Sequence, residues 1–315
     1  MNQRPHPSLL AGLIAVMVAS WSLNFIFGKI GLRHFAPLTL ASFRVELAAL
    51  LMAPIYAIQR LARLPRARPF NRRDFWTFAY LGLLGVGVNQ VCFTIGLNYT
   101  TVGHSALVVG MNPILILLLA RLQGLEALTA KKVTGMAMAF AGVAVLASEH
   151  GFSLHSGTLS GDLITFTGTL GLALYTVLGK RVAAEYDSVS MNAFNYFVGG
   201  IVFLPLAIRQ ALGLSRGHAW GLVAWEGWVA LGFMAVFASV VAYLIYFWVL
   251  RYMTASRLGA FGYLHPVMTT TLGVALLGER LTWPLLGGGT LVLAGVYLIE
   301  SGPRENQPAA IDLRD

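Results

Sequence analysis

The sequence contains few charged residues. Of its 315 residues only 11% are Asp, Glu, Lys or Arg, whereas 57% are hydrophobic and the mean hydropathy is +0.70. A soluble domain carries about 25% charged residues, so this chain has too few charges to cover a water-facing surface. The sequence therefore indicates an integral membrane protein, whose main solvent is lipid.

Signatures of several enzyme classes are also missing. The single cysteine, Cys92, lies in an apolar run and excludes a disulfide framework. The sequence has no phosphate-binding Gly-x-x-x-x-Gly-Lys-Ser/Thr loop, no zinc-binding His-Glu-x-x-His and no Gly-x-Ser-x-Gly of serine hydrolases. Glu46 is the one carboxylate clearly inside an apolar segment, so neither an acidic metal site nor a paired-carboxylate mechanism is expected. We predict no metal, no cofactor and no enzymatic activity.

Long, continuous apolar runs dominate what remains. Helices of about 20 apolar residues and closed barrels of alternating strands are the two ways to cross a bilayer, and continuous runs favour helices. We therefore expect an all-α protein with ten transmembrane helices, joined by short loops that make neighbours antiparallel. The expected spans are approximately residues 8–28, 37–58, 75–97, 101–121, 132–149, 161–180, 189–209, 225–248, 254–277 and 283–301.

One stretch of the sequence occurs twice. Residues 99–143 and 252–296 share 11 identities over 45 positions at a constant spacing of 153 residues, where chance would give about three or four. The preceding halves match more weakly, at a spacing of 151 residues. The matches there are Leu23/Leu174, Gly28/Gly179, Lys29/Lys180 and Phe43/Phe194. The chain is therefore predicted to be an internal duplication.

The duplication predicts two domains of five helices, at residues 9–148 and 160–300, followed by a disordered cytoplasmic tail at 302–315. Because five is an odd number, the second domain must enter the membrane upside down relative to the first. Inverted repeats of this kind form many secondary transporters, in which the substrate site lies at the repeat interface near the midplane of the membrane.

Positive charge is distributed unevenly among the loops. The formal net charge is +9, and most lysine and arginine residues fall in loops on the side that carries both termini. The densest group, between the second and third spans, consists of Arg60, Arg63, Arg66, Arg68, Arg72 and Arg73. Because cytoplasmic loops are enriched in positive residues, we expect both termini in the cytoplasm. Interpreted in this way, the excess charge does not indicate nucleic-acid binding.

Two prolines interrupt apolar spans at equivalent positions of the repeats. Pro113 follows Asn112 in the fourth span, and Pro266 follows His265 in the ninth. Proline removes one backbone donor and frees a carbonyl group, which in lipid needs another partner. We predict that both prolines are hinges beside a polar cavity that Asn112 and His265 face. A static packing kink, closed by neighbouring helices, is the alternative.

Two charged residues lie within the second span. A charge inside a membrane helix costs at least about 2.5 kcal/mol on insertion scales, so Arg44 and Glu46 should face a cavity or a partner. Their spacing points them to different faces of the helix, so they are not expected to pair with each other. We predict that Arg44 binds a substrate carboxylate or balances a cavity charge, and that Glu46 couples transport to protons. The alternatives are that Arg44 reaches outer phosphates and Glu46 caps a neighbouring helix.

The other cavity candidates are polar residues deep in apolar spans, namely Asn89, Asn195, Tyr175 and Tyr243. Amides within spans either hold helices together or line a path, and both interpretations remain open here. Aromatic residues near span ends usually form interfacial belts, so deep tyrosines are better cavity candidates. Together with Arg44, Asn112 and His265, these four residues form the predicted substrate-binding set.

Several of these features resemble one family. In the first half they are Trp21-Ser-Leu-Asn24-Phe, Lys29 and Phe43-Arg44, and in each half a Glu-x-Leu-Thr element and an Ala-Gly-Val in the last span. In these features the chain resembles paired EamA domains of the drug/metabolite transporter superfamily. Gly278-Glu279 keeps the family's Gly-Glu pair, whereas Gly124-Leu125-Glu126 departs from it. The resemblance implies export of small metabolites, including amino acids and their derivatives, by alternating access through a central cavity.

We therefore expect a multi-pass protein of the plasma membrane, the inner membrane of a bacterium, that exports amino acids, their derivatives or related amphipathic solutes. Its expected partners are a small-molecule substrate and the lipid bilayer, without nucleic acid, and a homodimer is compatible with the sequence. An intramembrane lipid-linked transferase and a non-transporting helper subunit are the rival functions. The transferase would need acidic metal ligands or a nucleophile with a base, and the sequence offers no such cluster.

Overall fold

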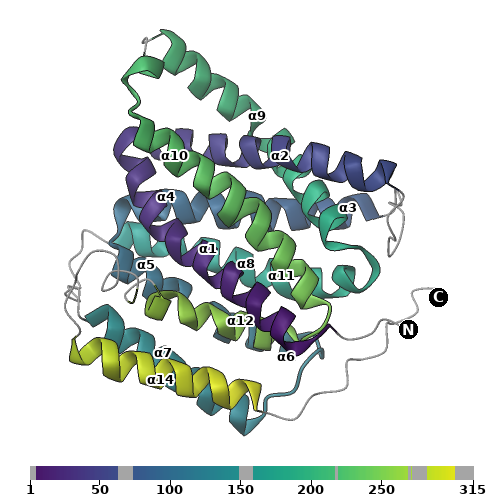
Figure 1. Ribbon diagram of the computed structural model, residues 1–315, viewed down its shortest axis with the longest axis vertical. Helices are drawn as coiled ribbons and strands as arrows, with labels where there is room; N and C mark the ends of the chain where they lie inside the picture. Colours follow the sequence, from purple (N-terminus) through teal and green to yellow (C-terminus); the bar gives the residue numbers. More distant parts are fainter. Residues whose placement is uncertain are drawn as a thin grey trace.

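The computed structural model describes residues 5–62, 74–148, 159–216, 219–268, 271 and 282–301. All regular secondary structure in these segments is helical (Figure 1), which confirms the predicted all-α class. The predicted tail at 302–315 lies outside the described residues, and so does the second Glu-x-Leu-Thr element up to Leu281.

The first repeat contains two long helices, a third span in three segments, a broken fourth span and a closing helix. Its elements are α1 (Pro7–His34), α2 (Pro37–Leu61), α3 (Phe75–Gly82), the π-helix η2 (Leu83–Gln90), α4 (Val91–Tyr99), α5 (Val102–Val109), α6 (Asn112–Leu122) and α7 (Ala130–Ser148).

The second repeat follows the same order. Its elements are α8 (Leu159–Glu185), α9 (Ser188–Arg216), the 3-10 turn η3 (Ala219–Leu222), α10 (Trp225–Phe233), the π-helix η4 (Met234–Val241), α11 (Ala242–Leu250), α12 (Ala255–Ala260), the 3-10 turn η5 (Phe261–Tyr263) and α14 (Trp283–Glu300). Residues 264–268 continue the chain after η5 as helix.

Nine helices in the described part of the chain are long and apolar enough to cross a membrane. They correspond to nine of the ten predicted spans. The remaining span, predicted at 254–277, begins with α12 and η5, and most of its second half lies outside the described residues. The described helices form two sets of similar order, one on each side of residues 149–158.

Equivalent helices of the two repeats run in opposite directions. At one end of the α2–α9 pair, Thr39 donates a hydrogen bond to Gln210 (3.0 Å), and at the other end Gln59 donates to Asp187 (2.9 Å). The start of each helix thus lies beside the end of the other. The α7–α14 pair is arranged in the same way, because Gly135 contacts Gly295.

Close backbone contact joins α7 to α14, which lie side by side at the lower edge of the molecule in Figure 1. A Cβ atom added to Gly142 would lie 2.6 Å from the carbonyl oxygen of Gly288, and one added to Gly288 would lie 2.8 Å from that of Gly142. Small residues allow membrane helices to approach in this way, and the contact gains its energy from packing. These glycines are therefore required by the fold.

Equivalent lysines form the same hydrogen bonds in each repeat. Lys29 at the end of α1 donates to the carbonyl oxygens of Leu97 and Thr100, the latter at 2.8 Å. Its counterpart Lys180 in α8 donates to those of Leu250 and Met253, the latter again at 2.8 Å. Because carbonyl groups at helix C-termini lack partners within the helix, each lysine caps the third span of its own repeat.

A buried carboxylate joins the repeats at the loop after α6. Glu126 accepts hydrogen bonds from Lys132 (2.9 Å), from the Ser256 backbone amide at the start of α12 (3.0 Å) and from the Ser256 hydroxyl. In the same loop the Thr129 hydroxyl accepts a hydrogen bond from the Lys132 backbone amide at 3.3 Å. These contacts give the loop a structural role, since they fix the start of α7 and the start of α12.

We predict that a methyl group at Gly288 destabilises the protein, because it would collide with the backbone of α7. Gly288→Ala should lower the free energy of unfolding by about 1–3 kcal/mol, the usual cost of overpacking, seen as a lower melting temperature in detergent. The matched control is Gly287→Ala, one residue earlier in the same helix, where nothing lies within 4 Å of the added atom. Equal melting temperatures for the two variants would contradict the packing described for α7 and α14.

Candidate functional site

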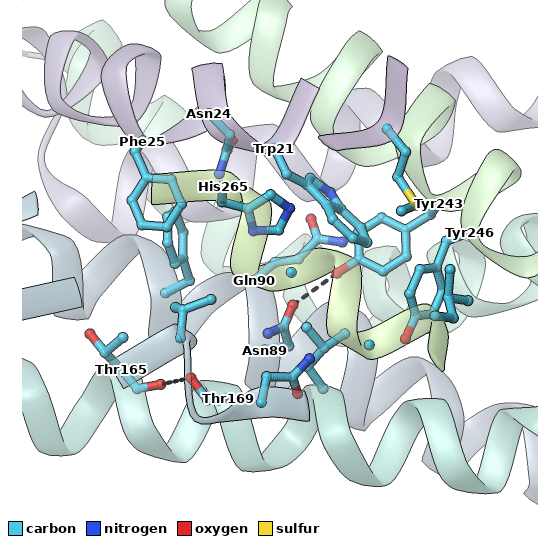
Figure 2. Close-up of a pocket in the computed structure, with 18 of the residues that line it drawn as sticks. Trp21, Asn24, Phe25, Asn89, Gln90, Thr165, Thr169, Tyr243, Tyr246 and His265 are labelled. Carbon is cyan, nitrogen blue, oxygen red and sulfur yellow. Dashed lines mark hydrogen bonds between the residues drawn. The ribbon is translucent and has the colours of Figure 1, made fainter. Parts of the chain in front are cut away.

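A central cavity lies where both repeats meet. Its volume is about 80 Å³, and it is lined by residues of α1, α2, η2, α4, α5, α6, α8, α11, α12 and η5 (Figure 2). Typical ligand pockets measure about 300–1,000 Å³, so this space is smaller than a metabolite needs. A solute of metabolite size would require the walls to move.

Aromatic side chains form one wall. The ring centroid of Trp21 lies 5.3 Å from that of Tyr243, 5.4 Å from that of Tyr246 and 5.8 Å from that of His265. The Trp21 indole also donates to the carbonyl oxygen of Ala238 in η4 (3.0 Å), which fixes the ring. Figure 2 shows Trp21, His265 and Tyr243 grouped on one side of the cavity.

A chain of hydrogen bonds holds Arg44 in place. Its Nε atom donates to the Ser239 hydroxyl (2.8 Å), which donates to Gln90 (3.1 Å). Gln90 donates to the Tyr196 hydroxyl (2.6 Å), and that hydroxyl donates back to the Ser239 carbonyl group (3.0 Å). The side chain of Arg44 is only 3% exposed, so its orientation depends on this network.

Two residues of this network, Gln90 and Ser239, come from the two π-helices. Gln90 ends η2 and Ser239 lies in η4, and the two segments begin 151 residues apart, at Leu83 and Met234. π-Helical turns are rare and often occur at functional sites. The local sequences share no common pattern, since η2 contains Gly85 and Gly87 whereas η4 contains no glycine.

Asn89 uses both ends of its amide within the protein. It accepts a hydrogen bond from the Tyr243 hydroxyl (2.9 Å) and donates to the carbonyl oxygen of Gly168 in α8 (3.0 Å). The Tyr243–Asn89 bond is drawn in Figure 2. Both residues line the cavity, and their contacts tie α8, η2 and α11 together.

Other lining residues present polar atoms without partners. The side-chain oxygens of Asn24 and Asn112, the Nη1 atom of Arg44 and both ring nitrogens of His265 are buried and have no hydrogen-bond partner among the described residues. Native proteins leave few buried polar groups unpaired. Such atoms also occur elsewhere in the described residues, as at Asn192 and Gln123, but those that line the cavity are the ones a bound solute could pair with.

The structure brings together five of the seven predicted substrate-binding residues, namely Arg44, Asn89, Asn112, Tyr243 and His265. Tyr175 and Asn195 are fully buried outside the cavity lining, where Asn195 donates to the Tyr175 hydroxyl (2.7 Å). The Tyr175 ring occupies the space beside Gly85 in η2. This pair supports the cavity wall from behind.

Glu46 and the two predicted hinges lie around this centre. A Cβ atom added to Gly200 of α9 would lie 3.4 Å from a Glu46 carboxylate oxygen, so Glu46 faces α9 and does not line the cavity. Pro113 lies in the first turn of α6, where proline is well tolerated, and the chain turns between α5 and α6 just before it. Pro266 follows η5, so both spans are broken beside the cavity.

Several cavity residues were not in the predicted set. Thr165 and Thr169 of α8, Gln90, Tyr246 and Trp21 all line the cavity. Gln90 adjoins Asn89, and this pair of polar residues within an apolar span could have identified Gln90 as a cavity residue. Threonine and tryptophan are common in membrane helices, and their sequence positions alone do not indicate a cavity.

The membrane-spanning helices, with a central cavity between the two repeats, are the architecture of a multi-pass membrane transporter. Residues 8–148 and 159–301 match the EamA-like transporter family, once for each repeat. The chain therefore belongs to this family, whose members transport solutes and are not enzymes.

Curated relatives extend over nearly the full chain. An "Uncharacterized transporter" of Archaeoglobus fulgidus is 29% identical over 290 residues, covering 91% of this chain and 97% of the relative. The "Uncharacterized inner membrane transporter YedA" of Escherichia coli is 27% identical over 302 residues, covering 93% and 94%. A solved crystal structure with 18% identity superposes with a TM-score of 0.71 over 93% of this chain and 96% of that chain, which shows a shared fold.

We predict that cavity positions react with a water-soluble thiol reagent, because solute exchange must open the cavity to water. In a Cys92→Ser background, which removes the single native cysteine, Asn112→Cys should be labelled in membrane vesicles. Asn195→Cys is the matched control, a buried amide outside the lining, and should stay unlabelled. Equal labelling rates at the two positions would contradict the assignment of the cavity wall.

Proposed function

We propose that this protein is a secondary transporter that exports small metabolites, namely amino acids, their derivatives or related amphipathic solutes, from the cytoplasm by alternating access. The observation that carries the proposal is the cavity at the interface of two inverted repeats, where unpartnered polar atoms from both repeats converge. Inverted-repeat transporters bind their substrates at such interfaces. The direction of transport is the one implied by the resemblance to the drug/metabolite transporter superfamily.

Each repeat has one contact with the first helix of the other repeat, which we call a seam: α5 with α8, and α12 with α1. One seam is closed and the other is open, and this difference supports alternating access. At the first seam α5 packs against α8. Asp162 near the start of α8 accepts a hydrogen bond from Thr100 (2.6 Å), and its second carboxylate oxygen lies 3.1 Å from the His104 ring of α5. These contacts close the seam.

The corresponding seam in the other half lies between α12 and α1 and is open. A second cavity, of about 730 Å³, is lined there by residues of α1 such as Leu10 and Ile14, by Arg257 of α12 and by Phe261 of η5. The seams occupy opposite ends of the bundle in the proposed topology, so the protein is closed at one end and open at the other. Alternating access would exchange these two arrangements.

The open seam lies at the end where the described chain begins and finishes, because both Pro5 and Glu300 line the second cavity. The excess of positive residues in loops on the same side makes this end cytoplasmic in our proposal. The plasma membrane location follows from the relatives, one of which is an inner membrane transporter by name. Glu46, half-buried against α9, remains the candidate for proton coupling.

We predict that the purified protein, reconstituted in liposomes, gives saturable counterflow of at least one solute from an untargeted metabolite extract. Asn112→Trp should abolish this counterflow, because the indole would fill a cavity of only about 80 Å³. Asn98→Trp, at an exposed position of α4 outside that cavity, is the matched control and should retain activity.

Two results would overturn the transport proposal. One is a folded, monodisperse preparation that moves no solute, which would leave the helper subunit as the function. The other is counterflow that persists in Asn112→Trp, which would place the transport path elsewhere.

A further inference from the structure

The central cavity carries a positive charge that no described group balances. Arg44 is 3% exposed, its Nε atom is bonded to the neutral Ser239 hydroxyl, and its Nη1 atom has no partner. It is the only Asp, Glu, Lys or Arg side chain among the described residues that line the cavity. Glu46, on the same helix, faces Gly200 of α9 instead.

Three lysines in the described residues have partners that Arg44 lacks. Lys132 is buried against Glu126 at 2.9 Å. Lys29 and Lys180 each donate to two carbonyl groups at a helix C-terminus, where the helix dipole favours positive charge. A buried cation without a counterion is costly, so its retention beside a cavity points to an anion supplied from outside the chain.

The local geometry prepares the guanidinium group for such an anion. Ser239, Gln90 and Tyr196 form a closed set of hydrogen bonds that holds the Nε edge of Arg44. The Nη1 atom therefore remains available on a side chain that cannot rotate freely. A fixed, planar guanidinium matches a carboxylate better than any other side chain does.

The cavity also contains hydrogen-bond acceptors that need a donor. The side-chain oxygens of Asn24 and Asn112 are buried and unpartnered, and so are both nitrogens of the His265 ring, of which a neutral ring offers one as acceptor and one as N–H donor. A neutral hydroxyl or amide N–H group on the ligand would satisfy one of these oxygens. Leaving such groups unpaired costs about 1–3 kcal/mol each, so they contribute to selectivity for a ligand with a donor.

Charge balance decides between the classes of solute. A monoanion makes the filled cavity neutral, whereas a zwitterion or a neutral solute leaves the cavity with a net positive charge and a simple amine increases that charge. Building on the proposed transport function, we propose that the substrate is a monoanionic carboxylic acid with a neutral hydrogen-bond donor, such as a hydroxy acid or an N-acylated amino acid. The carboxylate binds Arg44, the donor binds Asn24 or Asn112, and the apolar body contacts Trp21 and Tyr246.

The test compares three probes that share one carbon skeleton. They are the hydroxy acid analogue of leucine (a monoanion), leucine itself (a zwitterion) and the amide of the hydroxy acid (neutral). Binding is measured as the shift in melting temperature of the purified protein, and transport as counterflow in liposomes. We expect the hydroxy acid to stabilise the protein and to be exchanged. Leucine and the amide should each bind at least about thirtyfold more weakly, because the amide forms no charge pair with Arg44 and leucine brings an ammonium group that no described lining residue neutralises.

Arg44 variants separate a binding role from a structural one. Arg44→Gln should abolish the response to the hydroxy acid, and Arg44→Lys should retain part of it because a cation remains. Without ligand, Arg44→Gln should melt at the same temperature as the wild type or higher, since it removes an uncompensated buried charge. Arg209→Gln, at an exposed position of α9, is the control and should respond like the wild type.

Three outcomes would overturn the inference: no stabilisation by the hydroxy acid, equal or tighter binding of leucine or the amide, or a wild-type response in Arg44→Gln. A lower melting temperature of ligand-free Arg44→Gln would also count against it. Saturable counterflow of another solute, without binding of the hydroxy acid, would support the transport function and contradict the proposed substrate class. Binding of the hydroxy acid without any counterflow would support the ligand class and contradict the transport function.

Discussion

The bilayer interior offers no hydrogen-bond partners, so each polar group buried in this protein must find one within the chain. Much of the described structure follows from this constraint. Lys29 and Lys180 complete the ends of the third spans, and Glu126 joins Lys132 to the start of α12. Some buried polar atoms in the described residues remain unpaired, both away from the cavity, as at Asn192 and Gln123, and around it, at Arg44, Asn112 and other lining residues. Only those around the cavity lie where a bound solute could supply the missing partner.

The scaffold is symmetric and the cavity is not. Helix lengths, broken spans, π-helices and caps recur in the two repeats, and α2 and α7 pack antiparallel against their own counterparts. In the cavity, Arg44 of the first repeat corresponds to Asn195 of the second, which is buried outside the lining. A symmetric frame permits two equivalent arrangements of the seams, while asymmetric lining residues give one binding site with a defined charge.

The sequence predicted the fold well because its signals are strong. Long apolar runs indicate spans without ambiguity, and a duplication with an odd number of helices dictates the inverted arrangement. The π-helices could not be predicted, since η4 has no sequence feature that separates it from an ordinary apolar helix. The repeat predicted that Pro266 occupies the position equivalent to Pro113. Most of the span after Pro266 lies outside the described residues.

The cavity was predicted in part. Arg44, Asn112 and His265 stand out because charged and polar residues are rare in apolar spans, and all three line the cavity. Asn195 and Tyr175 carry the same signal but bond to each other behind the wall. Sequence gives the depth of a residue in the membrane but not the direction of its side chain, because a helix rotation of a few tens of degrees moves a group from lining to support.

Alternating access at the two seams is the central claim, and distances between spin labels test it most directly. In a Cys92→Ser background, one label pair at Leu9 and Thr254 reports on the α1–α12 seam, and another at Thr101 and Leu159 reports on the α5–α8 seam. The account predicts that transported solute changes the two distance distributions in opposite directions, so that one seam narrows as the other widens. Changes in the same direction, or none at either seam while solute is being exchanged, would contradict it.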